Sequence, residues 1–271
     1  MKVTDGSTPV LCGGTRVAGK ARQFSPDGLS VSVIIGVLNG AAYLENAIQS
    51  VRHQSYRDVE LIVIEGGSSD GTVEILRRHS DFIDYWISEA DGGLYEAWNK
   101  GVKLAKGDWI AFLGADDCYE PDAIAKYVDF ILSTGKEFDY VSSRVRFRYP
   151  DNSLRIHGSA WNWKIFRKYM NVTHFGSLHH RRLFQRFGEF DVSYRIAGDY
   201  EFLLRAGDKL QAGFLDTVTA EARVGGISNS VRTIKETLRA KTTTGCRSPL
   251  AARMEYWWAR IKFAMRRMLE A

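Results

Sequence analysis

Short apolar runs alternate with segments of helical periodicity over the first two-thirds of this 271-residue chain. Four of the runs are rich in β-branched and aromatic residues, as strands buried on both faces of a parallel sheet are: 31–38, 59–64, 83–87 and 109–113. The segments between them, such as residues 94–105, repeat apolar side chains with the period of an amphipathic helix. Strands and helices alternating at this length predict a mostly parallel α/β sheet built from βαβ units.

After residue 139 the pattern becomes less regular. Residues 140–149 alternate apolar and basic side chains and predict a half-exposed antiparallel strand. Helices are expected at 161–170, 181–187 and 199–206, and strands at 175–180 and 213–218. The doubly wound half, residues 30–118, is the part expected to bind a nucleotide, and residues 119–228 are expected to bind a second substrate.

Composition indicates the cellular location expected for the protein. Residues 1–29 are rich in Gly, Ser and Thr and predict a disordered leader without the apolar core of a signal peptide. Three scattered cysteines match no disulfide or metal-ligand spacing, so a cytoplasmic location is expected. No apolar run is long enough to span a bilayer.

The net charge of +5 is concentrated at the C-terminal end. From residue 231 onward there are ten basic and three acidic residues, a net charge of +7. The basic balance therefore belongs to the extension at residues 229–271 and gives no reason to expect a nucleic-acid partner.

Two adjacent carboxylates, Asp116 and Asp117, follow the apolar run at 109–113. Such a pair in a loop is most often solvated or caps the next helix. In an open α/β sheet, however, ligands bind beyond the carboxyl ends of the strands, where a charged pair needs a counter-ion. Mg²⁺ or Mn²⁺, with phosphate and water as its remaining ligands, would supply that counter-ion. The expected ligand is a nucleoside diphosphate.

Three further polar residues have both a functional and a structural interpretation. Glu65 ends the run at 59–64 and is expected to point into the same crevice as Asp116, where it could accept hydrogen bonds from a base or ribose. Asp199 begins a predicted helix as an N-cap carboxylate does, and it is also separated from the acidic pair as a general base would be. His174 is either a hydrogen-bonded core histidine or part of a site.

Four segments of the chain resemble family 2 glycosyltransferases of the GT-A fold from bacterial polysaccharide and lipopolysaccharide assembly. They lie between residues 30 and 228 in the family's order: VSVIIGVLNGAAYLENAIQSVRHQSYRDVELIVIEGGSSDGT, SEADGGLYEAWNKGVKLAKGDWIAFLGADD, FGEFDVSYRIAGDYEFLLR and GGIS at 225–228. The resemblance implies a Rossmann-like, mostly parallel sheet with helices on both faces and a smaller antiparallel acceptor region; a C-terminal amphipathic helix is expected beyond it.

The resemblance also implies the reaction. It is an inverting, metal-dependent, hexosyltransferase-like transfer from a UDP-, GDP- or dTDP-sugar to a hydroxyl of a glycan or lipid-linked acceptor, in cell-surface polysaccharide biosynthesis. The matching positions imply a metal ligand at Asp117 together with Asp116, a catalytic base at Asp199, an acceptor-side residue at His174, and donor contacts at Asn39, Glu65, Asp91, Lys100 and Asp116.

Some positions depart from the family pattern. Gly36 replaces a common hydroxyl residue, Glu65 the usual Asp, Gly114 a frequent Asn, and Phe175 a frequent Gln. None of these changes removes the expected metal ligands or base. The alternative is a nucleotide-binding protein or nucleotidyltransferase on the same fold, which would carry Arg and Lys in a Gly-rich first βα turn. Residues 37–42 contain no basic residue, so the glycosyltransferase is favoured.

The last segment, residues 253–271, predicts an amphipathic helix. Its apolar residues share one helical face: Met254, Trp257, Trp258, Ile261, Met265, Met268 and Leu269. Its basic residues lie mainly on the other: Arg260, Lys262, Arg266 and Arg267. Two interpretations remain, a helix docked on the protein's own core and a helix lying on an anionic membrane. The second would make the protein peripheral at the inner face of the cell membrane, close to a lipid-linked acceptor.

Overall fold

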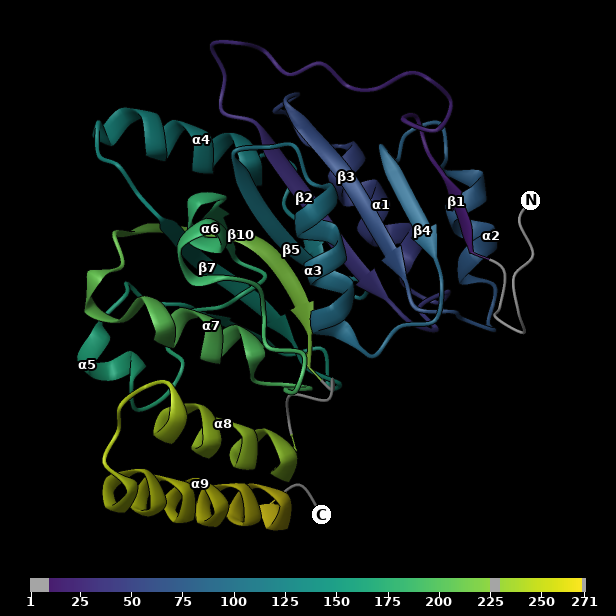
Figure 1. Ribbon diagram of the computed structural model, residues 1–271. Coiled ribbons are helices and arrows are strands. Elements are labelled where there is room, and N and C mark those ends of the chain that lie inside the picture. Colours follow the sequence, from purple (N-terminus) through teal and green to yellow (C-terminus); the bar gives the residue numbers. More distant parts are fainter. Residues whose placement is uncertain (1–9, 225–229, 270–271) are drawn as a thin grey trace.

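A computed structural model describes residues 10–224 and 230–269 (Figure 1). These residues form one ten-stranded sheet with helices packed against it. The strands are β1 Leu11–Gly13, β2 Val31–Val37, β3 Val59–Glu65, β4 Tyr85–Ser88, β5 Trp109–Gly114, β6 Cys118–Tyr119, β7 Tyr140–Arg148, β8 Leu154–His157, β9 Ser177–His180 and β10 Ala212–Arg223. The helices are α1 Leu44–Arg52, α2 Thr72–Arg78, α3 Leu94–Leu104, α4 Ala123–Thr134, α5 Trp163–Phe166, α6 Arg182–Phe187, α7 Gly198–Ala206, α8 Val231–Thr243 and α9 Pro249–Leu269, with a 3₁₀ turn at Gly207–Lys209.

The strand order brings the ends of distant strands to one edge of the sheet. The order is β1-β4-β3-β2-β5-β9-β7-β10-β6, with β8 paired to β7. Strands β4, β3, β2 and β5 are parallel. Strand β9 is antiparallel to both β5 and β7, and β10 is parallel to β7, so β7 and β10 run in the same direction as β5. The carboxyl ends of these six strands therefore lie at the same edge, where α/β sheets bind ligands.

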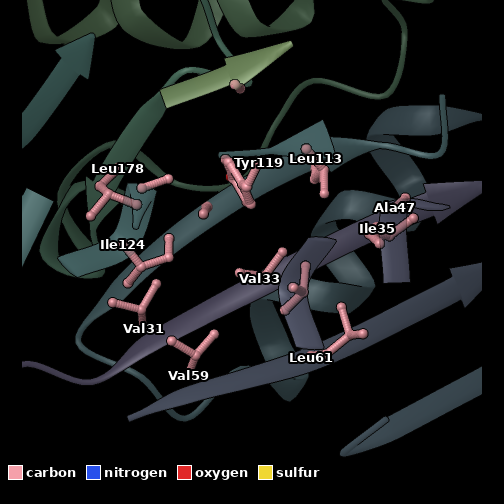
Figure 2. Packing of buried hydrophobic residues seen from close by; sticks show 14 of the residues in the cluster. Val31, Val33, Ile35, Ala47, Val59, Leu61, Leu113, Tyr119, Ile124 and Leu178 are labelled. Carbon is pink, nitrogen blue, oxygen red and sulfur yellow. The ribbon is translucent and has the colours of Figure 1, made fainter. Parts of the chain in front are cut away.

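Alternating residues of the central strands bury two separate cores. Val33 and Ile35 of β2 face a core covered by α1, α2 and α4, part of which is shown in Figure 2. Ile34 of the same strand faces a second core, covered by α3, α6 and α7. Because both faces of these strands are buried, their sequences are continuously apolar, which is why they were predictable.

The expected disordered leader is wrong for residues 10–29. Strand β1 pairs antiparallel with β4 and extends the sheet. Arg16 forms an ion pair with buried Glu60, and Arg22 lies 3.0 Å from buried Asp84. The partners of residues 10–29 in these contacts are far along the chain, so the local sequence pattern could not predict the order of this segment. Residues 1–9 lie outside the described residues.

Two other expectations are met only in part. The strand expected at 140–149 is β7, which is antiparallel to β8 and β9 as predicted but is also parallel to β10, so it lies inside the sheet. The helix expected at 161–170 is only α5. Asn162 caps its start, and Trp161 lies outside the helix and packs against Phe166, with ring centroids 4.3 Å apart. The GGIS segment lies outside the described residues.

Candidate active site

The acidic pair lies immediately after β5, at the ligand-binding edge of the sheet. Asp117 is 8% exposed, whereas Asp116 is exposed to solvent. The Asp117 N–H donates to the carbonyl of Gly114 at 3.1 Å, which turns the chain back over the strand end. A Cβ at Gly114 would lie 2.5 Å from Asp117 Oδ2 and 3.0 Å from Asp116 Oδ1. Both carboxylates therefore gather over the backbone of Gly114, in space that a larger residue would occupy.

The surroundings of the pair favour a bound cation. Burial first, and then the charge of Asp116, raise the pKa of Asp117 to about 7. Within the described residues neither carboxylate forms an ion pair, and no third His, Cys, Asp or Glu joins them as a possible metal ligand. A divalent cation here would have two protein carboxylates at most. That number suits Mg²⁺ or Mn²⁺ that is also bound by phosphate and water.

A cavity of about 370 Å³ opens beside Asp116. It is lined by Tyr43, Asp116, Arg148, Tyr149, Pro150, Asn152, Arg223 and Val224. The Arg148 Nε lies 2.6 Å from Glu221, and the Arg223 guanidinium lies over the Tyr43 ring at 5.1 Å. Sequence reasoning missed both arginines, because their relevance depends on β7 and β10 ending next to β5.

Asn39 and Glu65 connect the loops that follow β2 and β3. The Asn39 N–H donates to Ser68 Oγ at 2.7 Å, and the Ser69 N–H donates to Asn39 Oδ1 at 3.0 Å. Glu65 has no exposed surface, and its carboxylate accepts hydrogen bonds from the Ser68 N–H and the Ser88 hydroxyl, both at 2.5 Å. The expected opening of Glu65 into the crevice is therefore absent in this conformation. Its donor contact stays a prediction that requires these loops to move.

Asp91 and Lys100 lie on the next loop and helix. Asp91 Oδ1 accepts a hydrogen bond from the Gly93 N–H at 2.9 Å, and burial raises the pKa of the Asp91 carboxyl. The space beside Gly66, directly after Glu65, is filled by the Asp91 carboxylate. Lys100 Nζ lies 2.8 Å from Glu89 and 3.2 Å from Glu96. Asp91 thus lies beside the carboxyl end of β3, while Lys100 forms ion pairs with two neighbouring carboxylates.

Asp199 lies in the first turn of α7 and is held against the start of α3. The Tyr95 hydroxyl lies 2.6 Å from the Ile196 carbonyl oxygen and 3.2 Å from Asp199 Oδ1, and it can donate to either. A Cβ at Gly198 would lie 2.7 Å from the Tyr95 ring, so the glycine permits this close packing. Burial raises the pKa of Asp199 to about 6, although hydrogen bonds from the Tyr200 N–H and Tyr95 lower it. Such a carboxylate can accept a proton near neutral pH.

His174 lies in the core beneath α3. Its side chain is 6% exposed and stacks against both Trp98 and Phe112, with ring centroids 4.7 Å and 5.0 Å away. Burial, and then His179, lower its pKa well below the usual value, and its ring nitrogens have no hydrogen-bond partner among the described residues. His174 is therefore a buried core residue in this conformation, and its acceptor-side role stays a prediction.

The mostly parallel α/β sheet, with an acidic pair after a central strand and a separate carboxylate on a later helix, has the GT-A fold. The sequence profile of glycosyl transferase family 2 matches residues 32–196. The chain belongs to this family and is a glycosyltransferase, so the family and fold class implied by the sequence motifs are confirmed.

Two relatives illustrate the sequence similarity. A "PGL/p-HBAD biosynthesis glycosyltransferase" of Mycobacterium bovis is 32% identical over 213 residues, covering 74% of this chain and 79% of the relative. An "uncharacterized glycosyltransferase" of Mycobacterium tuberculosis is 35% identical over 187 residues, covering 65% of this chain and 68% of the relative.

Solved structures share the fold at low sequence identity. S. aureus TarS 1–349 in complex with UDP-GlcNAc superimposes with a TM-score of 0.64 at 14% identity, covering 84% of this chain and 70% of TarS 1–349. The mannosyltransferase PcManGT from Pyrobaculum calidifontis, in complex with GDP-Man and Mn²⁺, gives 0.59 at 19% identity, with coverages of 83% and 68%. This chain spans 39% of the longer TarS chain.

Proposed function

We propose that this glycosyltransferase moves a sugar from a UDP-, GDP- or dTDP-sugar to a hydroxyl of a glycan or lipid-linked acceptor, with inversion at the anomeric carbon. The observation that carries the proposal is the contact between Tyr95 and Asp199. It holds a carboxylate whose pKa is about 6 against the helix that begins at the Asp91 turn. The nucleotide-sugar complexes of TarS and PcManGT support the donor class, and the name of the M. bovis relative supports a role in cell-surface glycan or glycolipid assembly.

The proposed reaction is a single displacement. Asp199 accepts the proton of the acceptor hydroxyl while its oxygen bonds to the anomeric carbon and the bond from that carbon to the nucleoside diphosphate breaks. One base and one displacement invert the anomeric configuration. The donor binds on the other side of the site, along Asp91 and Asp116, where Asn39 and Glu65 support the loops.

Asp117 and Asp116 are proposed to hold Mg²⁺ or Mn²⁺. The residues fit this ion because two carboxylates gather over Gly114 without an ion-pair partner in the described part of the chain. When bound, the ion would stabilise negative charge on the departing diphosphate. The complex of PcManGT with Mn²⁺ supports the choice of metal.

An Asp199→Asn substitution tests the proposed base. It should lower kcat by about 100- to 10,000-fold, because the amide cannot accept the hydroxyl proton. Binding of nucleoside diphosphate with Mn²⁺, measured by calorimetry, should be unchanged, because Asp116 and Asp117 are intact. Asp208→Asn, an exposed carboxylate just after α7, is the matched control. Transfer at the wild-type rate, or joint loss of transfer, nucleotide binding and thermal stability, would contradict the assignment.

We further propose that α9 lies on an anionic lipid bilayer. It packs against α8, where Glu255 lies 3.0 Å from Lys241, and Ala252 on the same side is fully buried. Glu255 also lies 2.6 Å from Arg247, in the connection between the two helices. The opposite face carries exposed apolar residues: Leu250, Met254, Trp257, Trp258, Ile261 and Met265. Figure 1 shows α9 outermost, on the far side of α8 from the sheet. Docking of this face on the protein's own core is therefore not seen among the described residues.

Charge complementarity points to a lipid surface as the occupant. Exposed Arg253 and Lys262 adjoin the apolar stripe, and Lys262 Nζ lies 5.2 Å from the Trp258 ring. Tryptophan and basic residues on one helix surface suit the boundary between anionic headgroups and acyl chains. No helix in the described ranges is long and apolar enough to cross a membrane. A peripheral position at the inner face of the cell membrane would bring the site to a lipid-linked acceptor.

A further inference from the structure

Helix α8 contacts the loop that carries the proposed base. One carboxylate oxygen of Glu236, Oε2, accepts hydrogen bonds from three consecutive backbone N–H groups: Arg195 at 3.0 Å, Ile196 at 2.8 Å and Ala197 at 3.1 Å. The side chain is 12% exposed, and Arg232 donates to its other oxygen at 3.1 Å. Three amides converging on one ionised oxygen make strong, charge-assisted hydrogen bonds.

These amides immediately precede α7. Ala197 is the N-cap residue of α7 and has no side-chain oxygen to accept from the helix N-terminus. Glu236 therefore supplies, from a distant helix, a negative charge at the positive end of α7. Asp199 lies two residues beyond Ala197, so the carboxylate of Glu236 and the proposed base share one short stretch of backbone.

The same stretch is held from the opposite side by Tyr95. In the peptide group that joins Ile196 and Ala197, the Ala197 N–H donates to Glu236 at 3.1 Å, and the Ile196 carbonyl oxygen lies 2.6 Å from the Tyr95 hydroxyl. The same hydroxyl lies 3.2 Å from Asp199 Oδ1, so a chain of contacts runs from Glu236 through this peptide group and Tyr95 to Asp199. If Glu236 were removed, this peptide group could rotate and draw Tyr95 away from Asp199.

A second residue of α8 grips the loop further upstream. Arg239 Nη2 lies 2.6 Å from Ser193 Oγ, and the guanidinium lies 4.1 Å from the centroid of the Tyr194 ring. Helix α8 thus holds the loop at 193–194 and at 195–197. It begins at Val231, beyond residue 196 where the match to the family profile ends.

We propose that Glu236 is a positioning residue for catalysis: through the 195–197 backbone and Tyr95 it sets the orientation of Asp199. This inference rests on the proposed function, in which Asp199 is the base. Under this inference α8, which lies outside the region matched by the family profile, affects the rate of the chemical step (kcat) and does not affect donor binding.

The test uses the full-length protein with Glu236→Ala and Glu236→Gln, and Lys235→Ala as a control on the same helix. Glu236→Ala should lower kcat by about 10- to 100-fold, because a small displacement of a catalytic group has that cost. The donor KM and the calorimetric affinity for nucleoside diphosphate with Mn²⁺ should change by less than about twofold, because the donor side is not touched. Glu236→Gln keeps an acceptor oxygen and should recover part of the lost kcat. Lys235→Ala should match the wild type.

A double-mutant cycle separates positioning from a general structural effect. If Glu236 acts through Tyr95, the kcat losses of Glu236→Gln and Tyr95→Phe should be less than additive in free energy when combined. Full additivity, an unchanged kcat in Glu236→Ala, or equal loss of kcat, nucleotide affinity and melting temperature in both Glu236 variants would overturn the inference. Asp199→Asn is measured in parallel. If it stays active, the proposed function fails; if only the Glu236 variants behave as wild type, this inference alone fails.

Discussion

At the scale of single residues, environment separates carboxylates of the same chemical type. Asp116 is exposed, whereas burial and the charge of Asp116 raise the pKa of neighbouring Asp117 to about 7. Asp199 stands apart from this pair, with a pKa of about 6 set mainly by burial. Glu65 is fully buried but hydrogen-bonded to Ser68 and Ser88. Asp199 is thus suited to proton transfer, and Asp116 and Asp117 are suited to binding a cation. Glu65 instead holds two loops together.

The acid limb of the pH–rate profile should follow Asp199. A base works in its ionised form, so kcat should fall as the pH drops through about 6. Tyr95→Phe removes a hydrogen bond that lowers the pKa of Asp199, so the acid limb should move to higher pH by about 0.5–1 unit, the equivalent of one net hydrogen bond. Tyr56→Phe, which removes a hydroxyl bonded to the Leu29 carbonyl, is the control. A shift to lower pH, or none, would contradict the assignment of Asp199 as the base.

At the scale of elements, α3 organises the site. Tyr95 in its first turn reaches Asp199, Trp98 stacks on His174, and Gly101 packs against Ile34 of β2. The apolar periodicity of residues 94–105 was enough to predict this helix. The partners of Tyr95 and Trp98 were not predictable, because they come from segments about 75 to 100 residues later in the chain, which only the tertiary fold brings close.

A Gly101→Ala substitution tests the packing of α3 on β2. Alanine normally stabilises a helix by about 1 kcal/mol relative to glycine. Here its Cβ would overlap side-chain atoms of Ile34, which is fully buried and cannot move aside. Overpacking of a dense core costs about 1–3 kcal/mol, so a net loss of about 1 kcal/mol is expected in chemical denaturation. Lys103→Ala, at an exposed position of α3, serves as the control. An increase in stability for Gly101→Ala would show that α3 does not pack closely on β2.

At the scale of the whole molecule, the α8–α9 hairpin joins the two proposed features that lie apart in the fold, the support of Asp199 and the membrane surface. Glu236 of α8 holds the loop before Asp199. Helix α9, which carries the exposed apolar residues, lies on the far side of α8 from the sheet (Figure 1). The two helices are tied together by Glu255, which pairs with both Lys241 and Arg247. Contact of α9 with a bilayer would therefore occur on the same hairpin that orders the proposed base.

Vesicle flotation tests the membrane surface in the full-length protein. The wild type should float with vesicles that contain phosphatidylglycerol, bind phosphatidylcholine vesicles weakly, and dissociate as salt screens the charges. Trp257→Ser with Trp258→Ser should weaken binding by at least about 10-fold, because two apolar side chains no longer insert. Leu132→Ser removes an equally exposed apolar side chain from α4 and should have no effect. Equal flotation of the double variant and the wild type would exclude α9 as the contact.

The sequence predicted those strands and helices whose own residues show the apolar pattern of a buried element. Strands β2, β3 and β5 are continuous apolar runs because both faces are covered, and the acidic pair follows the last of them. Strand β6 has two residues and exists through its pairing with β10, and β1 exists through its pairing with β4. Ser230 accepts a hydrogen bond from the Thr233 N–H as an N-cap, so its place before a periodic segment could have indicated α8. It could not have shown what Glu236 touches.

The sequence by itself determined the family, the doubly wound architecture and the identity of the carboxylates at the sheet edge. These features depend on the order of residues along the chain and on the apolar periodicity of each segment. Only the tertiary structure decided that His174 belongs to the core, that Glu65 is closed off by Ser68 and Ser88, and that Glu236 supports the start of α7. Burial and hydrogen-bond partners are set by residues far apart in sequence, and these partners determine which polar side chain can act on a substrate.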